Sequence, residues 1–418
     1  MTLVEGILAR ASGRERVEPD EIVVAEVDHL ILHDLSAYLT SQVFEERVSL
    51  PVVRPERVTI VFDHLFSPPS EREADILEHN RTWARKHGIR VLDCGSGNIH
   101  NAVARAGLIG PGMVVVGSDS HTPVHGTLGA FAAGLGNDSH AGMVLPYGKA
   151  WFRVPRTIRI ELSGHPPAGT TARDVALWLT GHIGEGGAVY KALELAGDYV
   201  EGLDLFDRWL FPLVAVDVGA KCAYVEPDGT TADYLHSVGA HNGWQASAPA
   251  RHEDYEDVWQ IDVSAIEPQA ACPPTVGNVK PVSEAAGVRI DWAELGGHGG
   301  GRIEDFALAA EVLAGRGKHP DVHLNLVPCS REVFAEAVRN GLVETLHAAG
   351  GTWFPPSTGS NQAVNMGAMA AGERMVSTHS RNFPGRNGSS EAEMYLTSAA
   401  TVAASAARGQ ITDPRELA

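Results

Sequence analysis

Short runs rich in β-branched residues alternate with amphipathic stretches along the chain, and this alternation narrows the choice of fold more than any other feature. Strands are expected over residues 58–62, 113–116, 157–162 and 322–327, and helices over 71–87, 172–183 and 331–349. Strands that alternate with helices are typical of α/β architecture. The sequence therefore predicts an α/β protein.

Two breaks in this pattern divide the 418 residues into three segments. Residues 264–290 are rich in proline and poor in periodicity, which indicates a connection between domains. A softer boundary lies near residues 153–157. We therefore predict domains over residues 1–155, 156–280 and 281–418, since a typical domain has roughly 100–200 residues.

Charge and hydropathy exclude several classes of function. The chain has 33 Lys and Arg against 52 Asp and Glu, a net charge of −19, which argues against a nucleic-acid or acidic-membrane partner. Residues 1–21 carry charges throughout, unlike a signal peptide, and no apolar run approaches the roughly 18 residues of a spanning helix. We expect a cytoplasmic protein, and a small anionic substrate remains compatible with its charge.

The four cysteines are far apart and form no CxxC pair: Cys94, Cys222, Cys272 and Cys329. In a cytosolic chain of this size they are expected to be reduced and buried, without a disulfide framework. An iron–sulfur cluster requires closely placed thiolates. The cysteine spacing does not offer them.

One polar pair, Asp63 and His64, directly follows the predicted strand 58–62. The carboxyl ends of strands in an α/β sheet face the ligand crevice, so the pair is a candidate for catalysis. A helix cap or a solvated turn is the alternative interpretation.

A second polar run, Gly-Ser-Asp-Ser-His-Thr at residues 117–122, also follows a predicted strand. Asp119 and His121 are two residues apart and can form a carboxylate–imidazole pair, in which the carboxylate orients the ring for acid–base catalysis. An Asx turn with a surface histidine explains the run equally well. His100 is a similar candidate with less support.

Two arginines, Arg381 and Arg386, lie five residues apart in a segment rich in Gly, Pro and Asn. Arginine binds carboxylates through a bidentate fork, so the two side chains can converge on one anion. Two solvated arginines on an exposed loop are the alternative.

Five glycines surround His298 in residues 296–301. The backbone amides of such a loop can approach a ligand closely. No Gly-Lys-Ser/Thr follows, and residues 291–295 are a poor strand, so neither a Walker sequence nor a dinucleotide fingerprint is indicated.

Together these motifs resemble the aconitase superfamily, and most closely the large subunits of 3-isopropylmalate and homoaconitate dehydratases. Gly-Ser-Asp-Ser-His-Thr with a downstream Arg-Asn-Phe-x-Gly-Arg is a highly specific combination. The resemblance runs nearly end to end and includes residues 7–10, 21–34, 148–152, 219–221, 279–284 and 400–405.

The resemblance implies three α/β domains around a central cleft. The family's fourth, swivelling domain would be a separate small subunit that brings the catalytic serine base and further arginines. The implied reaction is a dehydration or rehydration of a small hydroxycarboxylate, in which a proton leaves the carbon next to a carboxylate.

Matching of motifs also assigns roles to residues of this chain. Arg381 and Arg386 would clamp substrate carboxylates, and Ser120 would contact the substrate. The acid–base and hydroxyl network would consist of Asp63, His64, His100, Asp119, His121 and Glu304.

The chain departs from the family where the family binds its [4Fe–4S] cluster. His298 stands at the position of one cluster cysteine, and Gly300 at that of an asparagine associated with the cluster. The segment matched to the family's Cys-Gly-Pro-Cys run is Trp353-Phe354-Pro355-Pro356, which has no thiol. We therefore expect no cluster, and Trp353 and Phe354 are candidates to fill its volume.

His298 by itself does not make a metal site, because a catalytic zinc takes about three protein ligands. His100, Asp119 and His121 would have to converge with it. Either no cofactor or a divalent metal ion is therefore compatible with the sequence. A general acid in a flexible loop and a tolerated replacement are the other interpretations of His298.

Two functions of different classes follow. The first is a cluster-independent lyase or isomerase that uses the arginine clamp, with His121 or His298 as the acid. It is favoured because a chain without catalytic duty has no chemical reason to keep these groups. The second is a non-catalytic carboxylate-binding or scaffold subunit. An ordinary [4Fe–4S] isopropylmalate dehydratase is disfavoured, since the cluster ligands are absent. Without a Lewis acid, expelling hydroxide loses several kcal/mol of transition-state stabilisation, so the first function is easiest with a better leaving group or with a reaction that only moves a proton or double bond.

Overall fold

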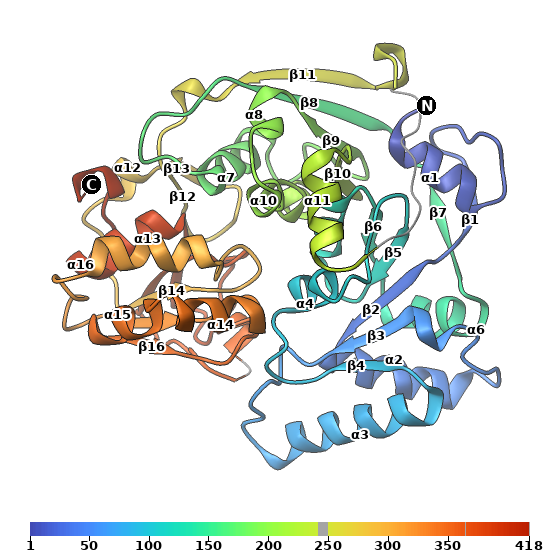
Figure 1. The fold of residues 1–418 in the computed structure, drawn as a ribbon, viewed down its shortest axis with the longest axis horizontal. Helices are drawn as coiled ribbons and strands as arrows, with labels where there is room; N and C mark the ends of the chain where they lie inside the picture. Colours follow the sequence, from blue (N-terminus) through green and yellow to red (C-terminus); the bar gives the residue numbers. More distant parts are fainter. Residues whose placement is uncertain (241–249, 364, 418) are drawn as a thin grey trace.

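Three large sheets and one two-stranded ribbon form the computed structural model, which describes residues 1–240, 250–363 and 365–417 (Figure 1). The large sheets draw on residues 29–134, 157–262 and 269–396. The ribbon pairs β1 (Ile22–Glu26) with β7 (Lys149–Arg153). One hydrophobic core runs from the first sheet into the second, and the domain boundaries at 155 and 280 remain predictions.

The first sheet is parallel throughout, in the order β4-β3-β2-β5-β6. Its strands are β2 (His29–His33), β3 (Val58–Val61), β4 (Arg90–Leu92), β5 (Val114–Gly117) and β6 (Phe131–Gly134). Helices α2 (Asp34–Arg47) and α3 (Glu71–His87) share a core with one face, and α4 (Ile99–Arg105) and the short helix η2 (Thr122–Leu128) share a core with the other. Burial on both faces explains the continuous β-branched runs of this part of the sequence.

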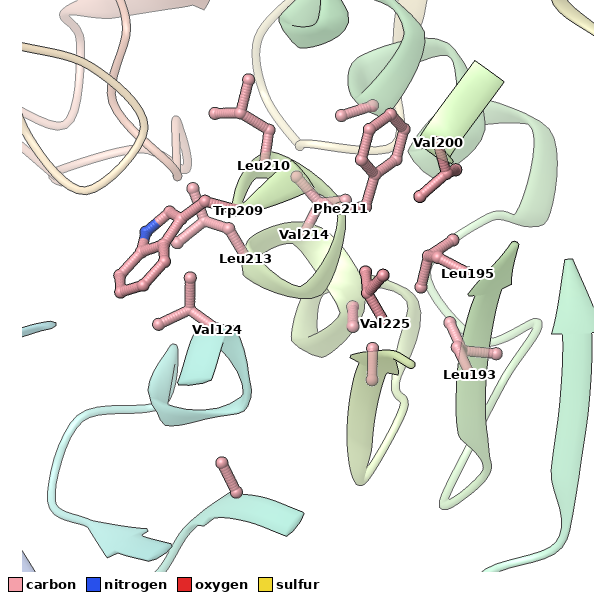
Figure 2. Close-up of a cluster of buried hydrophobic side chains, with 14 of the residues drawn as sticks. Val124, Leu193, Leu195, Val200, Trp209, Leu210, Phe211, Leu213, Val214 and Val225 are labelled. Atoms are coloured by element: carbon pink, nitrogen blue, oxygen red, sulfur yellow. The ribbon is translucent and has the colours of Figure 1, made fainter. Parts of the chain in front are cut away.

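The middle sheet is also parallel and packs onto the first through η2. Its order is β10 (Cys222–Val225), β9 (Ala192–Ala196), β8 (Thr157–Ser163) and β11 (Asp257–Asp262). Figure 2 shows Val124 of η2 pointing toward Leu213 and Trp209, at the α10 helix (Leu210–Val214) and the residue before it. Because η2 begins directly after His121, this packing fixes the segment that carries the Gly-Ser-Asp-Ser-His-Thr run.

The third sheet has five parallel strands and an antiparallel pair at one edge. Its order is β13 (Val279–Pro281), β12 (Gln269–Ala271), β18 (Glu393–Leu396), β17 (Arg374–Ser377), β14 (Trp292–Leu295), β15 (His323–Leu326) and β16 (Gly351–Trp353). Helices α13 (Ile303–Leu313) and α16 (Ala399–Arg408) contribute Phe306 and Val402 to its core.

Two expectations about local structure were wrong. Residues 291–295 contain β14, a buried strand between β15 and β17. The helix expected over 331–349 is two helices, α14 (Arg331–Arg339) and α15 (Leu342–Ala348), separated at Gly341, whose φ of 72° is left-handed. The other expected strands and helices are confirmed to within two residues, α3 over its full length.

Across the described ranges of the chain, no helix combines the length and apolar character that crossing a membrane requires.

Candidate active site

The candidate site lies where the carboxyl ends of the first and third sheets meet. The order of the first sheet reverses between β2 and β5, and that of the third between β14 and β17. Ligands of open α/β sheets bind at such switch points. Asp119 follows β5 and His298 follows β14, and the fold brings the two residues together.

Three contacts hold these two edges against each other. The Asn98 side chain donates to the Gly297 carbonyl over 3.1 Å. The Thr358 amide donates to the Asp63 carbonyl over 3.3 Å. An isolated β-bridge joins Gly97 to Ser330. Loops of the third sheet are thereby positioned over the polar residues of the first.

Asp119 is the centre of the site. Its Oδ1 atom lies 3.2 Å from Nε2 of His100, 3.3 Å from Nδ1 of His121 and 4.0 Å from Nδ1 of His298. The same oxygen accepts the His121 amide over 2.7 Å. Asp119 is 9% exposed, so it is buried but close to the solvent-accessible surface. Three residues expected from the sequence, Asp119, His121 and His100, therefore share one centre.

His121 also connects this centre to the arginine loop. Its Nε2 atom lies 3.8 Å from Oδ2 of Asp217, and the other carboxylate oxygen of Asp217 accepts from Nε of Arg381 over 3.2 Å. The Asp217 side chain is only 4% exposed. Carboxylate, imidazole, carboxylate and guanidinium thus follow one another within ion-pair distance, and His121 Nε2 itself has no hydrogen-bond partner.

Arg386 lies beside Arg381 and is bonded by its guanidinium to the Asn361 side-chain oxygen. Burial, followed by the charge of Arg381, lowers the pKa of Arg386 to about 10. Two neighbouring cations of this kind favour an anion between them. Ser120 is half-buried, with its hydroxyl 3.5 Å from Nδ1 of His121.

Asp63 and His64 form a fully buried pair next to this centre. His64 Nδ1 lies 2.8 Å from Asp63 Oδ1, and the other Asp63 oxygen accepts the first amide of α4 over 2.7 Å. Asp63 is therefore both a helix cap and the partner of an imidazole. Burial lowers the pKa of His64, but Asp63 and then Asp34 raise it to a net value of about 9.

The glycine-rich loop packs tightly and does not stand open. A Cβ atom at Gly300 would overlap the Thr378 side chain, and one at Gly297, whose φ is 73°, would overlap the ring of His379. The loop presents His298, which is 4% exposed. Its Nε2 atom lies 3.0 Å from the Thr358 hydroxyl, and its buried Nδ1 atom has no hydrogen-bond partner.

The pKa values of the titratable side chains in this cluster are shifted in different directions. Burial alone would raise the pKa of Asp119, but His298, His100 and His121 hold it well below its usual value. Burial lowers the pKa of His121, whereas Asp119 and Asp217 raise it and dominate. Burial keeps the pKa of His298 well below its usual range despite Asp119. The pKa shifts of Asp119 and His121 thus favour their charged forms, whereas that of His298 favours the neutral imidazole.

Glu304 lies apart from these residues. It is exposed in the first turn of α13, and among the described residues no hydrogen bond or ion pair links its carboxylate to the Asp119 cluster. Its expected place in the acid–base network receives no support from the geometry.

The model of the aconitase family (aconitate hydratase) matches residues 7–409. The chain belongs to the aconitase family. The α/β fold expected from the sequence is confirmed. In this member of the aconitase family, Asp119 lies among parallel strands whose sheets are covered by helices.

Relatives in the aconitase family match over their full length. The 3-isopropylmalate dehydratase large subunit 1 of Methanopyrus kandleri is 42% identical over 415 residues, 99% of each chain. A probable methanogen homoaconitase large subunit of Methanothermobacter thermautotrophicus is 39% identical over 425 residues, covering 100% of this chain and 98% of its own. Aconitase X of Thermococcus kodakaraensis, in its holo-form, shares the fold with a TM-score of 0.50 and 15% identity, over 90% of this chain and 87% of the other. The similarity to dehydratases supports a lyase of the aconitase family.

The residues of this chain do not fit the iron–sulfur cluster of the aconitase family. Such a cluster is held by cysteine thiolates, and all four cysteines are free and absent from the Asp119 cluster. Burial raises the pKa of Cys329, as of Cys94 and Cys222, to about 12, which disfavours the thiolate.

Trp353 and Phe354 were candidates to fill the volume of a cluster, and the structure shows where the ring of Trp353 lies. Trp353 ends β16, and its ring packs 4.8 Å from that of Phe306 and 5.8 Å from that of Phe334, in the core of the third sheet. The residues of this segment that reach the site follow later, at Thr358 and Asn361.

Three residues of the site were missed from the sequence. Asp217 stands two residues before the Gly219-Ala220-Lys221 motif, and that proximity was the available signal. Thr358 and Arg173 gave no signal. Arg173 is buried in α7 (Ala172–Ile183), where one nitrogen donates to the His379 carbonyl over 2.6 Å and two others have no partner.

Proposed function

We propose that this chain is the large subunit of a cluster-independent dehydratase that acts on a small hydroxycarboxylate. The observation that carries the proposal is the series of ion-pair contacts, each within 4.0 Å, that leads from His100 through Asp119, His121 and Asp217 to Arg381. This series places groups that can transfer protons beside an arginine that can bind a carboxylate. The two kinds of group must be adjacent if a proton is to leave the carbon next to a carboxylate.

In the proposed reaction, Arg381 and Arg386 hold the substrate carboxylates. A base removes the proton from the neighbouring carbon, and its electron pair forms the double bond as the C–O bond breaks. The hydroxide leaves as water with a proton from His121. Two neighbouring carboxylates stabilise the protonated form of this imidazole. An isomerase that adds water back at the other carbon would use the same groups.

The rest of the substrate has room beside Ser120. A cavity of about 320 Å³ adjoins this residue and is lined by Ser118, Pro123 and Lys221, among others. Lysine presents a compact positive charge to an anionic substituent. The cavity therefore supports a substrate with a polar or anionic second group.

We also propose a separate small subunit as partner, because the relatives that match end to end are named large subunits. The partner would supply the base. The free state of all four cysteines supports a reducing compartment such as the cytoplasm.

The test combines composition with turnover. Protein purified without oxygen, together with its small subunit, is expected to be colourless and to contain no acid-labile sulfide. Incubation with hydroxy-di- and tricarboxylates in D₂O is expected to give alkene signals and deuterium next to a carboxylate by NMR. His121→Asn should abolish both, whereas His182→Asn, an exposed histidine outside the site, should not.

Two outcomes would contradict the proposal. A brown protein with stoichiometric iron and sulfide would restore cluster chemistry. Carboxylate binding without exchange or turnover in the intact complex would instead favour a non-catalytic carboxylate-binding subunit.

A further inference from the structure

Three buried side chains from both switch points direct donor atoms toward one point. They are His100, from the start of α4; Asp119, after β5; and His298, after β14. One ligand atom from each lies within 4.8 Å of the other two. Two imidazole nitrogens and one carboxylate oxygen form a donor set that catalytic zinc and mononuclear iron sites use.

The separations are close to those of a filled site. Metal–ligand bonds of about 2.0–2.2 Å place neighbouring donors about 3–3.5 Å apart. His100 Nε2 is 3.2 Å from Asp119 Oδ1, and His298 Nδ1 is 4.0 Å from the same oxygen. Both separations are thus within 1 Å of those of a filled site, and the two imidazole nitrogens lie within 4.8 Å of each other.

The outer ring nitrogens are already oriented by a second layer of groups. The Thr358 hydroxyl lies 3.0 Å from His298 Nε2, and His125 Nε2 lies 3.4 Å from His100 Nδ1. Metal-bound histidines are typically fixed in this way through the nitrogen that does not bind the metal. The inner nitrogen of His298 is buried and has no hydrogen-bond partner, so a neutral ring leaves its lone pair free for an ion.

We propose that His100, Asp119 and His298 bind one divalent transition-metal ion of the zinc or ferrous type. Three protein ligands leave at least one coordination position for water or a substrate hydroxyl. Resting on the function proposed above, the ion would coordinate the departing hydroxyl oxygen and polarise the C–O bond as a Lewis acid.

A second group, His33, Asp34 and His64, is a poorer site. One Asp34 oxygen accepts the amides of His64 and Leu65, and His64 Nδ1 is bonded to Asp63. The Asp34 oxygen thus already accepts two backbone amides, whereas Asp119 Oδ1 accepts one.

Binding can be measured without turnover. Protein stripped by a chelator is titrated with Zn²⁺ by calorimetry, and with Co²⁺ while the visible spectrum is recorded. One ion per chain is expected. His298→Gln and Asp119→Asn should weaken binding at least 100-fold, and His29→Gln, a buried histidine outside the group, should bind as the wild type does.

Position 298 has a direct spectroscopic test. His298→Cys places a thiolate in the site, so its Co²⁺ form should gain a sulfur-to-cobalt charge-transfer band that the wild type lacks. Thr358→Val should weaken Zn²⁺ binding about 10- to 100-fold and Thr358→Ser should restore it, as expected of a group that positions a ligand. Stoichiometric binding that survives His298→Gln and Asp119→Asn, or no binding by the wild type, would overturn the metal site.

Different results would disprove the proposed role of the metal ion and the proposed reaction. Full turnover by the chelator-treated, metal-free complex would overturn the Lewis-acid role of the ion and leave the dehydratase intact. One tightly bound ion in a complex that turns over no hydroxycarboxylate would overturn the dehydratase and leave the metal site.

Discussion

Oδ2 of Asp217 lies 3.8 Å from Nε2 of His121, and this contact joins the acid–base cluster to the arginine loop. The other oxygen of Asp217 is bonded to Arg381, so the two halves of the site share one carboxylate. Replacing this shared carboxylate should therefore affect catalysis.

Asp217→Asn is expected to lower kcat/KM by about 100-fold or more, since general acid–base groups contribute roughly 10²–10⁴-fold and the amide no longer supports a charged His121. Steady-state kinetics of the complex provide the measurement. Asp207→Asn is the matched control, because Asp207 also pairs with an arginine, Arg302, but lies outside the cluster. Equal losses in both variants would mean that Asp217 acts only on the fold.

Arg386→Lys is expected to raise KM by about 10- to 100-fold, because lysine keeps the charge but loses the fork, and charge-assisted hydrogen bonds contribute roughly 1.5–3 kcal/mol. Arg386→Ala should raise KM further, with a smaller effect on kcat. Steady-state kinetics with one dicarboxylate and with its monoester distinguish a lost contact to the second carboxylate from a general effect on catalysis. A KM that is unchanged in both variants would remove Arg386 from the clamp.

Glu294 is expected to anchor the loops that carry Ser360 and His379. It is fully buried on β14 and accepts from His379 over 2.8 Å, from the Ser360 amide over 3.0 Å and from Asn325 over 3.0 Å. Glu294→Ala leaves these donors unsatisfied and should lower the free energy of unfolding by about 3–5 kcal/mol. Urea unfolding gives the value, with the exposed Glu284→Gln as control. A loss below 1 kcal/mol would contradict this role.

Stability is expected to fall in mild acid because of His29. Burial and then Arg90 and Arg57 lower its folded pKa to about 4, against 6.5 when unfolded. Between these values the unfolded chain binds the proton and the folded chain does not, so the stabilisation present above pH 6.5 is lost as pH falls toward 4. The loss from this group should reach about 2 kcal/mol at pH 5.

His29→Gln isolates that contribution. Urea unfolding of both proteins at pH 7.5 and pH 5 should show a smaller drop in the variant, by about 2 kcal/mol. Parallel pH profiles would mean that His29 takes up its proton equally in both states.

The sheet architecture could be predicted because its strands are continuous apolar runs, as at β3 and β5. β14 escaped prediction because Glu294, a charged residue, sits in its centre, and only tertiary partners reveal why it is buried. Gly341 was hidden within an amphipathic pattern, since one left-handed residue splits a helix without altering its apolar spacing.

For the site, residues carried by recognisable motifs could be predicted, and Asp119, His121 and His100 do meet. Convergence of His298 with them could not be predicted, because it depends on how two sheets face each other. Thr358 was missed because a single hydroxyl has no pattern in sequence, and the surroundings of Trp353 could not be predicted because an aromatic residue suits a core as well as a cavity.

The meeting of two switch points also divides the site between two distant parts of the chain. Asp119, His121 and His100 come from the first sheet, while His298, Thr358 and Ser360 come from loops of the third. The acid–base residues therefore sit on one set of strands, and separately encoded loops complete the site around them. Substitutions in those loops can change what surrounds Asp119 without altering the strand that carries it, so a new chemistry becomes reachable without a new fold.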